Sequence, residues 1–185
     1  MDYSETVSID NLDLSNLNCL LLGGSRFSYA VYRRIFEKFG AETDVYNFYG
    51  PTEATVYTHV CKLTGDPNED TLDQNVTIGV PFEGLKAKLL DRDRKEIVDV
   101  NYVGELHLGG PQVMTGYVEN KEQTELVLSE VAGTIFYKTG DLSFLDENGR
   151  YFIVGRVDET IKRRGFRINL LDIESYICSI DGARR

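Results

Sequence analysis

The chain has 185 residues, of which 42% are hydrophobic and 27% are charged. These proportions suit one globular domain or slightly more, with a sizeable core, and they argue against global disorder. The formal net charge of -10 and the pI near 4.7 exclude a protein that wraps nucleic acid, because such a protein needs clustered Lys and Arg. The same acidity argues against an anionic membrane surface as a partner.

Cysteine, histidine and apolar patterning indicate a cytoplasmic protein. No apolar run approaches the roughly 18 residues of a membrane-spanning helix, and the first residues do not resemble a signal peptide. Cys19, Cys61 and Cys178 match neither a disulfide framework nor a zinc pattern. With only His59 and His107, a histidine-based metal site has few ligands to draw on.

The first ordered stretch predicts a parallel α/β unit. "CLLLGG" indicates a buried strand that enters a tight turn, and "TDVYNFYG" indicates a second strand. Between them, "SYAVYRRIFEKFG" predicts a helix that stops at Gly40. We expect its apolar face to carry Ala30, Val31, Ile35 and Phe39. Ligands of such sheets usually lie at the carboxyl ends of strands, where "GGS" and "GPTE" occur.

The following region changes character. Short strands such as "LKAKLLD", "GELHLGG" and "TIFYKTG" are separated by glycine or acidic turns, and "DENG" between "LSFL" and "RYFIV" predicts a hairpin. This pattern indicates a small distorted antiparallel β-barrel or a strongly curved sheet. A third stretch begins near Arg156, is basic at first, and predicts an amphipathic helix from about Leu171. The fold class is therefore mixed α/β.

"YGPTEAT" is a turn in which Gly50 and Pro51 fix the backbone before Thr52 and Glu53. A hydroxyl beside a carboxylate can hold Mg²⁺ with its phosphates, because Mg²⁺ prefers oxygen ligands and keeps several waters. Tyr49 offers a flat face on which a base can stack. The same residues also suit an ordinary turn, with Thr52 or Glu53 as an N-cap and Tyr49 in the core. The motif alone leaves both interpretations open.

"YKTGDL" places Asp141 directly after Gly140, where a carboxylate can accept two hydrogen bonds from a ribose diol. An ordinary Gly-Asp turn is the alternative. A basic cluster follows in an otherwise acidic chain and comprises Arg156, Lys162, Arg163, Arg164 and Arg167. It suits either the steering of phosphates or a solvated face paired with Asp158 and Glu159.

The order of the motifs carries more information than any one of them. "NFYGPTEAT", "GELHLGGPQVMTGYVENKEQTE" and "YKTGDLSFLDENGRYFIVGRVDETIKRRGFRINLLDIES" together closely resemble the consecutive core motifs of adenylate-forming enzymes. That superfamily includes acyl-CoA synthetases, luciferases and the adenylation domains of non-ribosomal peptide synthetases. The resemblance covers about residues 17–177. "NFYGPTE" is more similar to the amino-acid-activating branch, and "YGPTEATV" with "YKTGD" is similar to D-alanine-activating enzymes that load a carrier protein.

By matched position, the resemblance implies a role for each motif residue. Tyr49 would stack on adenine with Asn47 nearby, and Asp141 would bind the ribose hydroxyls. Thr52 would contact phosphate, Glu53 would ligate Mg²⁺, and Arg156 would reach the ribose or the α-phosphate. The glycine turns of the nucleotide site would be Gly23, Gly24 and Gly50. The acyl or amino-acid pocket would be lined by Leu20, Leu22, Phe48, Val56 and Tyr57.

The resemblance also implies three parts of the chain. Residues 1–72 would end an α/β subdomain, 73–155 would form the barrel-like subdomain, and 156–185 would hold a hinge and the start of a small α+β C-terminal domain. Asp158 matches the hinge residue of the superfamily. The implied cofactors are ATP and Mg²⁺.

The implied reaction activates an amino acid or another small carboxylic acid as an acyl-adenylate, which is then transferred to the phosphopantetheine thiol of a carrier protein. The superfamily's phosphate loop and catalytic lysine have no match here, so we expect these 185 residues alone not to form adenylate. We also expect the remainder of the enzyme to be a partner. The alternative is a naturally truncated, non-catalytic module that binds a nucleotide or a partner chain.

Overall fold

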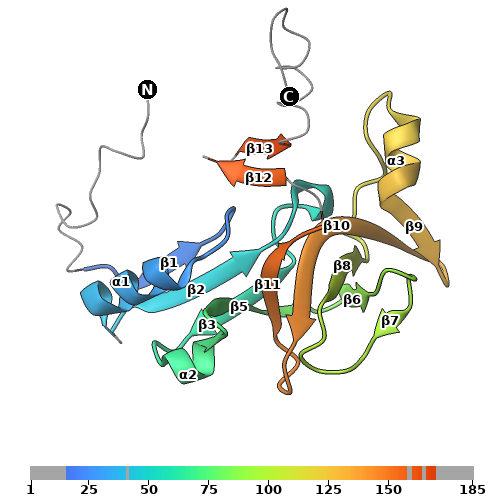
Figure 1. Ribbon diagram of the computed structural model, residues 1–185. Coiled ribbons are helices and arrows are strands. Elements are labelled where there is room, and N and C mark those ends of the chain that lie inside the picture. Colours follow the sequence, from blue (N-terminus) through green and yellow to red (C-terminus); the bar gives the residue numbers. More distant parts are fainter. Residues whose placement is uncertain (1–15, 41, 158–159, 164–165, 170–185) are drawn as a thin grey trace, which may run out of the picture.

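A parallel strand–helix–strand unit opens the ordered part of the molecule (Figure 1). The computed structural model describes residues 16–40, 42–157, 160–163 and 166–169. Strand β1 (Cys19–Leu22) pairs in parallel with β2 (Asp44–Tyr49), and helix α1 (Tyr29–Phe39) connects them. This confirms the α/β unit predicted from the sequence.

Helix α1 begins and ends where the sequence indicates, but its buried face differs from the prediction. The Ser28 hydroxyl accepts a hydrogen bond from the Val31 N–H at 3.3 Å, and Gly40 ends the helix with a left-handed φ of 63°. The side chains packed against the sheet come from Tyr29, Tyr32, Ile35, Phe36 and Phe39. Ala30 and Val31 are exposed, so their assignment to the buried face was wrong. The aromatic side chains of the neighbouring stripe, from Tyr29, Tyr32, Phe36 and Phe39, pack the helix against the sheet instead.

Strands β3 to β11 join this unit in one large sheet. They are β3 (His59–Leu63), β4 (Thr71–Leu72), β5 (Asn75–Pro81), β6 (Lys86–Leu90), β7 (Glu96–Ile97), β8 (Gly104–Gly109), β9 (Leu128–Val131), β10 (Thr134–Leu145) and β11 (Tyr151–Arg156). The order is β1-β2-β3-β5-β11-β10-β8-β6-β7, with β4 on β5 and β9 on β10. Short helices η3 (Thr52–Ala54), α2 (Pro67–Asp70) and α3 (Lys121–Val127) lie in the connections.

The described strands form an open, curved sheet, and a closed barrel is not confirmed. The strand order has two ends, β1 and β7, while β5 joins the earlier strands to the later ones through β3 and β11. Register shifts interrupt the pairings of β5 with β11, β11 with β10, and β10 with β8. Such irregularities bend strands, and Figure 1 shows the long β10 curving across the molecule. The three-part division of the chain stays a prediction.

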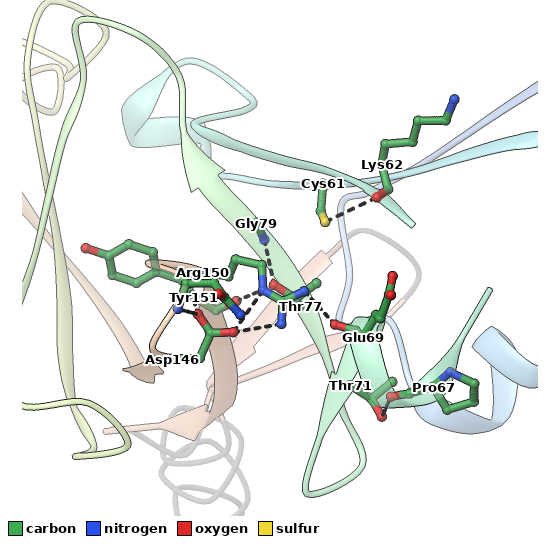
Figure 2. A network of polar contacts seen from close by, with 11 residues as sticks. Cys61, Lys62, Pro67, Glu69, Thr71, Thr77, Gly79, Asp146, Arg150 and Tyr151 are labelled. Atoms are coloured by element: carbon green, nitrogen blue, oxygen red, sulfur yellow. Dashed lines mark hydrogen bonds and ion pairs between the residues drawn. The ribbon is translucent and has the colours of Figure 1, made fainter. Parts of the chain in front are cut away.

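The predicted hairpin at "DENG" connects β10 and β11 and is tied to α2. Asp146 accepts hydrogen bonds from the Arg150 guanidinium at 2.8 Å, and Arg150 also donates to the Glu69 carbonyl at 2.5 Å (Figure 2). Arg150 therefore links the hairpin to a segment that precedes it by about eighty positions in the chain. This link fastens the turn between β10 and β11 to α2.

Two apolar clusters fill the described part of the molecule. One lies between α1 and the sheet around Tyr32, Ile35 and Val45, and the other lies among the later strands around Leu106 and Leu108. Strands β12 (Thr160–Arg163) and β13 (Phe166–Asn169) pair as a separate hairpin. The predicted helix from Leu171 lies outside the described residues. Within the described part, none of the helices has the length and apolar character needed to cross a membrane.

Candidate functional site

Tyr49, from the first motif, and Arg156, from the third, both contact Asp141. Its Oδ2 accepts a hydrogen bond from the Tyr49 hydroxyl, and its Oδ1 accepts one from Arg156 Nη1, both at 2.5 Å. Strands β2 and β10 are four positions apart in the sheet order, which would be about 19 Å in a flat sheet. The curvature of the sheet therefore brings "YGPTE" and "YKTGDL" together at one place.

A bulge in β10 presents the Asp141 carboxylate. Pairing between β10 and β8 is interrupted from Lys138 to Leu142, so the residues between them leave the regular ladder. Thr139 Oγ1 donates to the Leu106 carbonyl at 2.7 Å and accepts from the Asp141 N–H at 2.9 Å. Glu105 accepts the Gly140 N–H at 3.2 Å, while Gly140 has a left-handed φ of 70°. Two neighbouring side chains thus hold the turn in which Asp141 lies.

The surroundings of Tyr49 keep its hydroxyl protonated. Burial is the main cause that raises its pKa well above the usual range, and the negative charge of Asp141 adds to the shift. The phenol is therefore a hydrogen-bond donor to the carboxylate. His59, the cross-strand neighbour of Tyr49, packs its ring edge against the tyrosine at a centroid distance of 5.7 Å.

The "GPTE" turn forms the 3-10 helix η3 at the carboxyl end of β2. Thr52 is exposed, and Glu53 is half-buried. The Glu53 carboxylate accepts a hydrogen bond from the Tyr117 hydroxyl at 2.8 Å, and burial, followed by this hydrogen bond, raises the pKa of Tyr117. The Glu53 carbonyl accepts the Met114 N–H at 2.8 Å. Glu53 is consequently held through both its main chain and its side chain.

The glycines of the predicted site are explained by close packing or by backbone angle. A Cβ on Gly50 would lie 2.6 Å from the Val56 carbonyl oxygen, and one on Gly23 would lie 2.7 Å from the Tyr57 ring. Gly24 has open space around it and a left-handed φ of 85°. Gly23 therefore brings the end of β1 against the Tyr57 ring.

The predicted pocket residues do not gather on one face. Phe48 and Tyr57 lie together with a ring distance of 4.9 Å, and Val56 is exposed nearby in sequence. Leu20 and Leu22 instead pack with the cluster beneath α1, on the other side of the sheet from Phe48. The alternation of side chains along paired strands causes this separation.

Asn47 and Asp158 are the predicted site residues that remain to be placed. Asn47 is buried and donates to the Thr77 carbonyl at 2.7 Å, so its amide helps to join β2 to β5. The predicted hinge residue Asp158 lies outside the described residues. Tyr117 and Thr139 contact site residues, and Glu105 contacts Gly140 beside Asp141, but none of the three was singled out from the sequence. All three lie inside the quoted motifs, which was the available signal, but a motif does not reveal which of its residues touch.

The donors present suit a magnesium ion held largely by phosphate and water. Among the described residues, no group of three or more His, Cys, Asp or Glu side chains gathers as a metal cage. Glu53 supplies one carboxylate beside the Thr52 hydroxyl, and Mg²⁺ in nucleotide sites commonly uses one or two carboxylates with phosphate oxygens. The oxygen-only chemistry of this turn therefore fits Mg²⁺ bound together with a nucleotide.

Family comparison defines the class of protein. The family described as AMP-binding enzyme matches residues 2–118, more than half of the chain, and the chain belongs to this family. It is 38% identical over 168 residues to Gramicidin S synthase 2 of Brevibacillus brevis, and 36% identical over 162 residues to nonribosomal peptide synthetase agiA of Aspergillus flavus. These matches cover 89% and 86% of this chain but only 4% and 2% of the relatives' length.

Solved structures agree with this placement. PA1221, a nonribosomal peptide synthetase protein containing adenylation and PCP domains, superposes with a TM-score of 0.80 at 30% identity. The match covers 91% of this chain and 34% of PA1221. IdnL1 shares the fold with a TM-score of 0.80 at 24% identity, covering 91% of this chain and 35% of IdnL1. The chain thus spans about a third of the length of these structures.

Proposed function

We propose that the chain forms one side of the nucleotide site of an enzyme that activates an amino acid as its adenylate and loads it onto a carrier protein. The observation that carries this proposal is the contact of Asp141 with both Tyr49 and Arg156. These residues belong to the first and the third of the motifs that resemble adenylate-forming enzymes, and they meet although Tyr49 and Asp141 are 92 positions apart. Membership of the AMP-binding enzyme family supports the same function.

The proposed contacts to ATP follow from the chemistry of each side chain. Asp141 binds the ribose diol, because a carboxylate has about four lone-pair positions and can accept further hydrogen bonds beside those from Tyr49 and Arg156. Tyr49 stacks on adenine, and Arg156 neutralises charge at the ribose or the α-phosphate. Thr52 contacts phosphate. Gly23, Gly24, Gly50 and Asn47 shape the surrounding backbone.

The chain's part in the proposed reaction is positioning and charge stabilisation. A substrate carboxylate attacks the α-phosphorus of ATP, the bond to the β-phosphate oxygen breaks, and an acyl-adenylate and pyrophosphate form. Mg²⁺ held at Glu53 would neutralise phosphate charge. A rotation about Asp158 would then admit the carrier thiol for the second step.

An aromatic wall supports a small amino acid as substrate, with D-alanine as one candidate. Phe48 lies 4.9 Å from Tyr57 and 6.5 Å from Phe82 between ring centroids, so bulky side chains occupy this face of the sheet at the end of β2. The carrier-protein acceptor is supported by PA1221, which contains a PCP domain beside its adenylation domain. We propose the cytoplasm as the location, as the cysteine pattern suggests.

The proposal is tested by ATP binding to the complete gene product. Asp141→Ala removes the central carboxylate, and we expect it to weaken ATP binding measured by calorimetry by about tenfold or more, because hydrogen bonds to a charged group are lost. Asp99→Ala, which removes an exposed carboxylate of a surface loop, serves as the matched control and should bind like the wild type. Equal ATP affinity in the Asp141 variant and the control would contradict the nucleotide site.

A further inference from the structure

We propose that Tyr117 is a positioning residue, which holds the Glu53 carboxylate in the orientation that binds Mg²⁺ together with ATP. The inference rests on the proposed function and extends it to a residue outside the "YGPTE" turn. Tyr117 and Glu53 are 64 positions apart in the chain, and the hydroxyl donates to Glu53 Oε1 at 2.8 Å. This is a direct contact between the second and first of the three motifs.

The backbone of Tyr117 is held in place by contacts other than the hydrogen bond between its side chain and Glu53. Its N–H donates to Thr124 Oγ1 at 2.9 Å, which anchors it to the first turns of α3. The preceding Gly116 has a φ of 151°, and a Cβ there would lie 2.9 Å from the Thr124 methyl group. Glycine therefore permits the close approach that places Tyr117, and the phenol does not have to be ordered when ligand binds.

The same segment also fastens the backbone of the turn that carries Glu53. The Met114 N–H donates to the Glu53 carbonyl at 2.8 Å, and Thr55 Oγ1 donates to the Gln112 carbonyl at 2.7 Å. The connection from β8 to α3 thus meets η3 at three points. The first joins two backbones, the second joins the Thr55 side chain to the Gln112 backbone, and of these three only the Tyr117 hydroxyl contacts the Glu53 carboxylate itself.

The chemistry of carboxylate ligands explains why the hydrogen bond from Tyr117 to Glu53 matters for Mg²⁺ binding. A carboxylate on a flexible glutamate side chain samples several rotamers, and each must be restricted before it can bind a cation in octahedral geometry. A hydrogen bond to one oxygen restricts rotation while leaving lone pairs on the carboxylate for the cation. Loss of a hydrogen bond that orients a metal ligand typically lowers metal affinity 10- to 100-fold.

The test removes one oxygen atom from the complete gene product. Tyr117→Phe keeps the ring and loses the donor, and Tyr102→Phe, at an exposed tyrosine, is the matched control. ATP binding is measured by calorimetry over a series of Mg²⁺ concentrations, and AMP binding is measured without Mg²⁺. We expect Tyr117→Phe to raise the Mg²⁺ concentration for half-maximal enhancement of ATP binding by about tenfold, with AMP affinity unchanged.

Other outcomes separate failure of this inference from failure of the proposed function. A wild type that binds neither ATP nor AMP would overturn both. An unchanged Mg²⁺ dependence in Tyr117→Phe, with normal wild-type binding, would overturn the positioning role alone, as would an equal loss of AMP binding. If Tyr117→Phe does not fold, Tyr117→Met is the second variant that lacks the donor, and it must then show the same selective Mg²⁺ effect. Adding Tyr117→Phe to Glu53→Gln should cause no further change in Mg²⁺ dependence.

Discussion

At the scale of single residues, Asp141 is the point on which the site depends. Its carboxylate faces a cation on one oxygen and a phenol on the other, and its side chain and that of Arg156 are at most 14% exposed. Removing one member of such a pair leaves the other charge poorly solvated. In the proposed site, the nucleotide would share this acid with Tyr49 and Arg156, and we expect small displacements of either neighbour to alter its affinity.

His59 gives a prediction about stability and pH. It is fully buried, its Nε2 has no hydrogen-bond partner among the residues that the structure describes, and burial lowers its pKa from 6.5 to about 3. Between these values the unfolded chain binds a proton that the folded chain does not, so stability falls as pH decreases from 6.5 toward 3. We expect His59 to contribute a slope of up to about 1.4 kcal/mol per pH unit in this window.

Urea unfolding between about pH 4.5 and 7 measures this slope. His59→Gln should show a shallower loss of unfolding free energy toward acid than the wild type, whatever its stability at neutral pH. His107→Gln replaces the other histidine and should retain the slope that His59 causes. Parallel pH profiles for the wild type and His59→Gln would show that His59 is not held neutral.

At the scale of elements, the bends of the sheet depend on positions where two backbones touch. Gly79 of β5 has a left-handed φ of 79°, and a Cβ there would lie 1.9 Å from the Val60 carbonyl oxygen of β3. Gly149 of the hairpin turn has a similar φ of 75° but open space around it. Comparing alanine substitutions at these two glycines therefore separates the free-energy cost of a left-handed backbone from the cost of a close contact.

This pair gives a prediction with its own control. Gly149→Ala should lower the free energy of unfolding by about 1–2 kcal/mol, the usual cost of a left-handed alanine. Gly79→Ala should cost at least about 2 kcal/mol more, because the new methyl group overlaps the backbone of β3. Chemical denaturation of both variants measures the difference. Equal losses would mean that β3 and β5 are not packed as closely as the structure shows.

A helix, strand or hairpin could be predicted from the sequence where the pattern that specifies it lies within the element or its adjoining turn. The β1–α1–β2 unit follows from apolar runs, a helical period and the Gly40 stop, and the "DENG" turn identified its hairpin. The buried stripe of α1 was partly missed, because Tyr29 and Tyr32 compete with Ala30 and Val31 for the same period and the aromatic rings bury more surface. The open order of the later strands depends on pairs such as Tyr151 with Gly79, which no local pattern reveals.

The residues of the candidate site could be predicted from the sequence, but the contacts among them could not. Its principal residues lie in recognisable motifs, and the structure brings Tyr49, Asp141 and Arg156 together. The supports of the site, such as Thr139 and Tyr117, act through hydrogen bonds across the curved sheet, and spacing along the chain does not encode those distances. Leu20 and Leu22 lie on the opposite face of the sheet from Phe48, because side chains alternate between the two faces along the paired strands β1 and β2.

At the scale of the whole molecule, an acidic chain is proposed to bind a polyanion. With a net charge of -10, the overall field opposes the approach of ATP, so local cations must offset it. Arg156 beside Asp141 and Mg²⁺ at Glu53 would supply that charge where the phosphates lie. The curvature of the sheet contributes, because it brings Arg156 and Tyr49 to the same carboxylate, and Tyr49 lies shortly before Glu53 in the chain.

The most direct test of the central claim is amino-acid-dependent exchange of labelled pyrophosphate into ATP, measured with the complete gene product and a panel of amino acids that includes D-alanine. We expect exchange that requires Mg²⁺, that depends on the amino acid supplied, and that Asp141→Ala abolishes. ATP binding without exchange for any amino or small carboxylic acid would contradict the adenylate-forming role and leave a nucleotide-binding module.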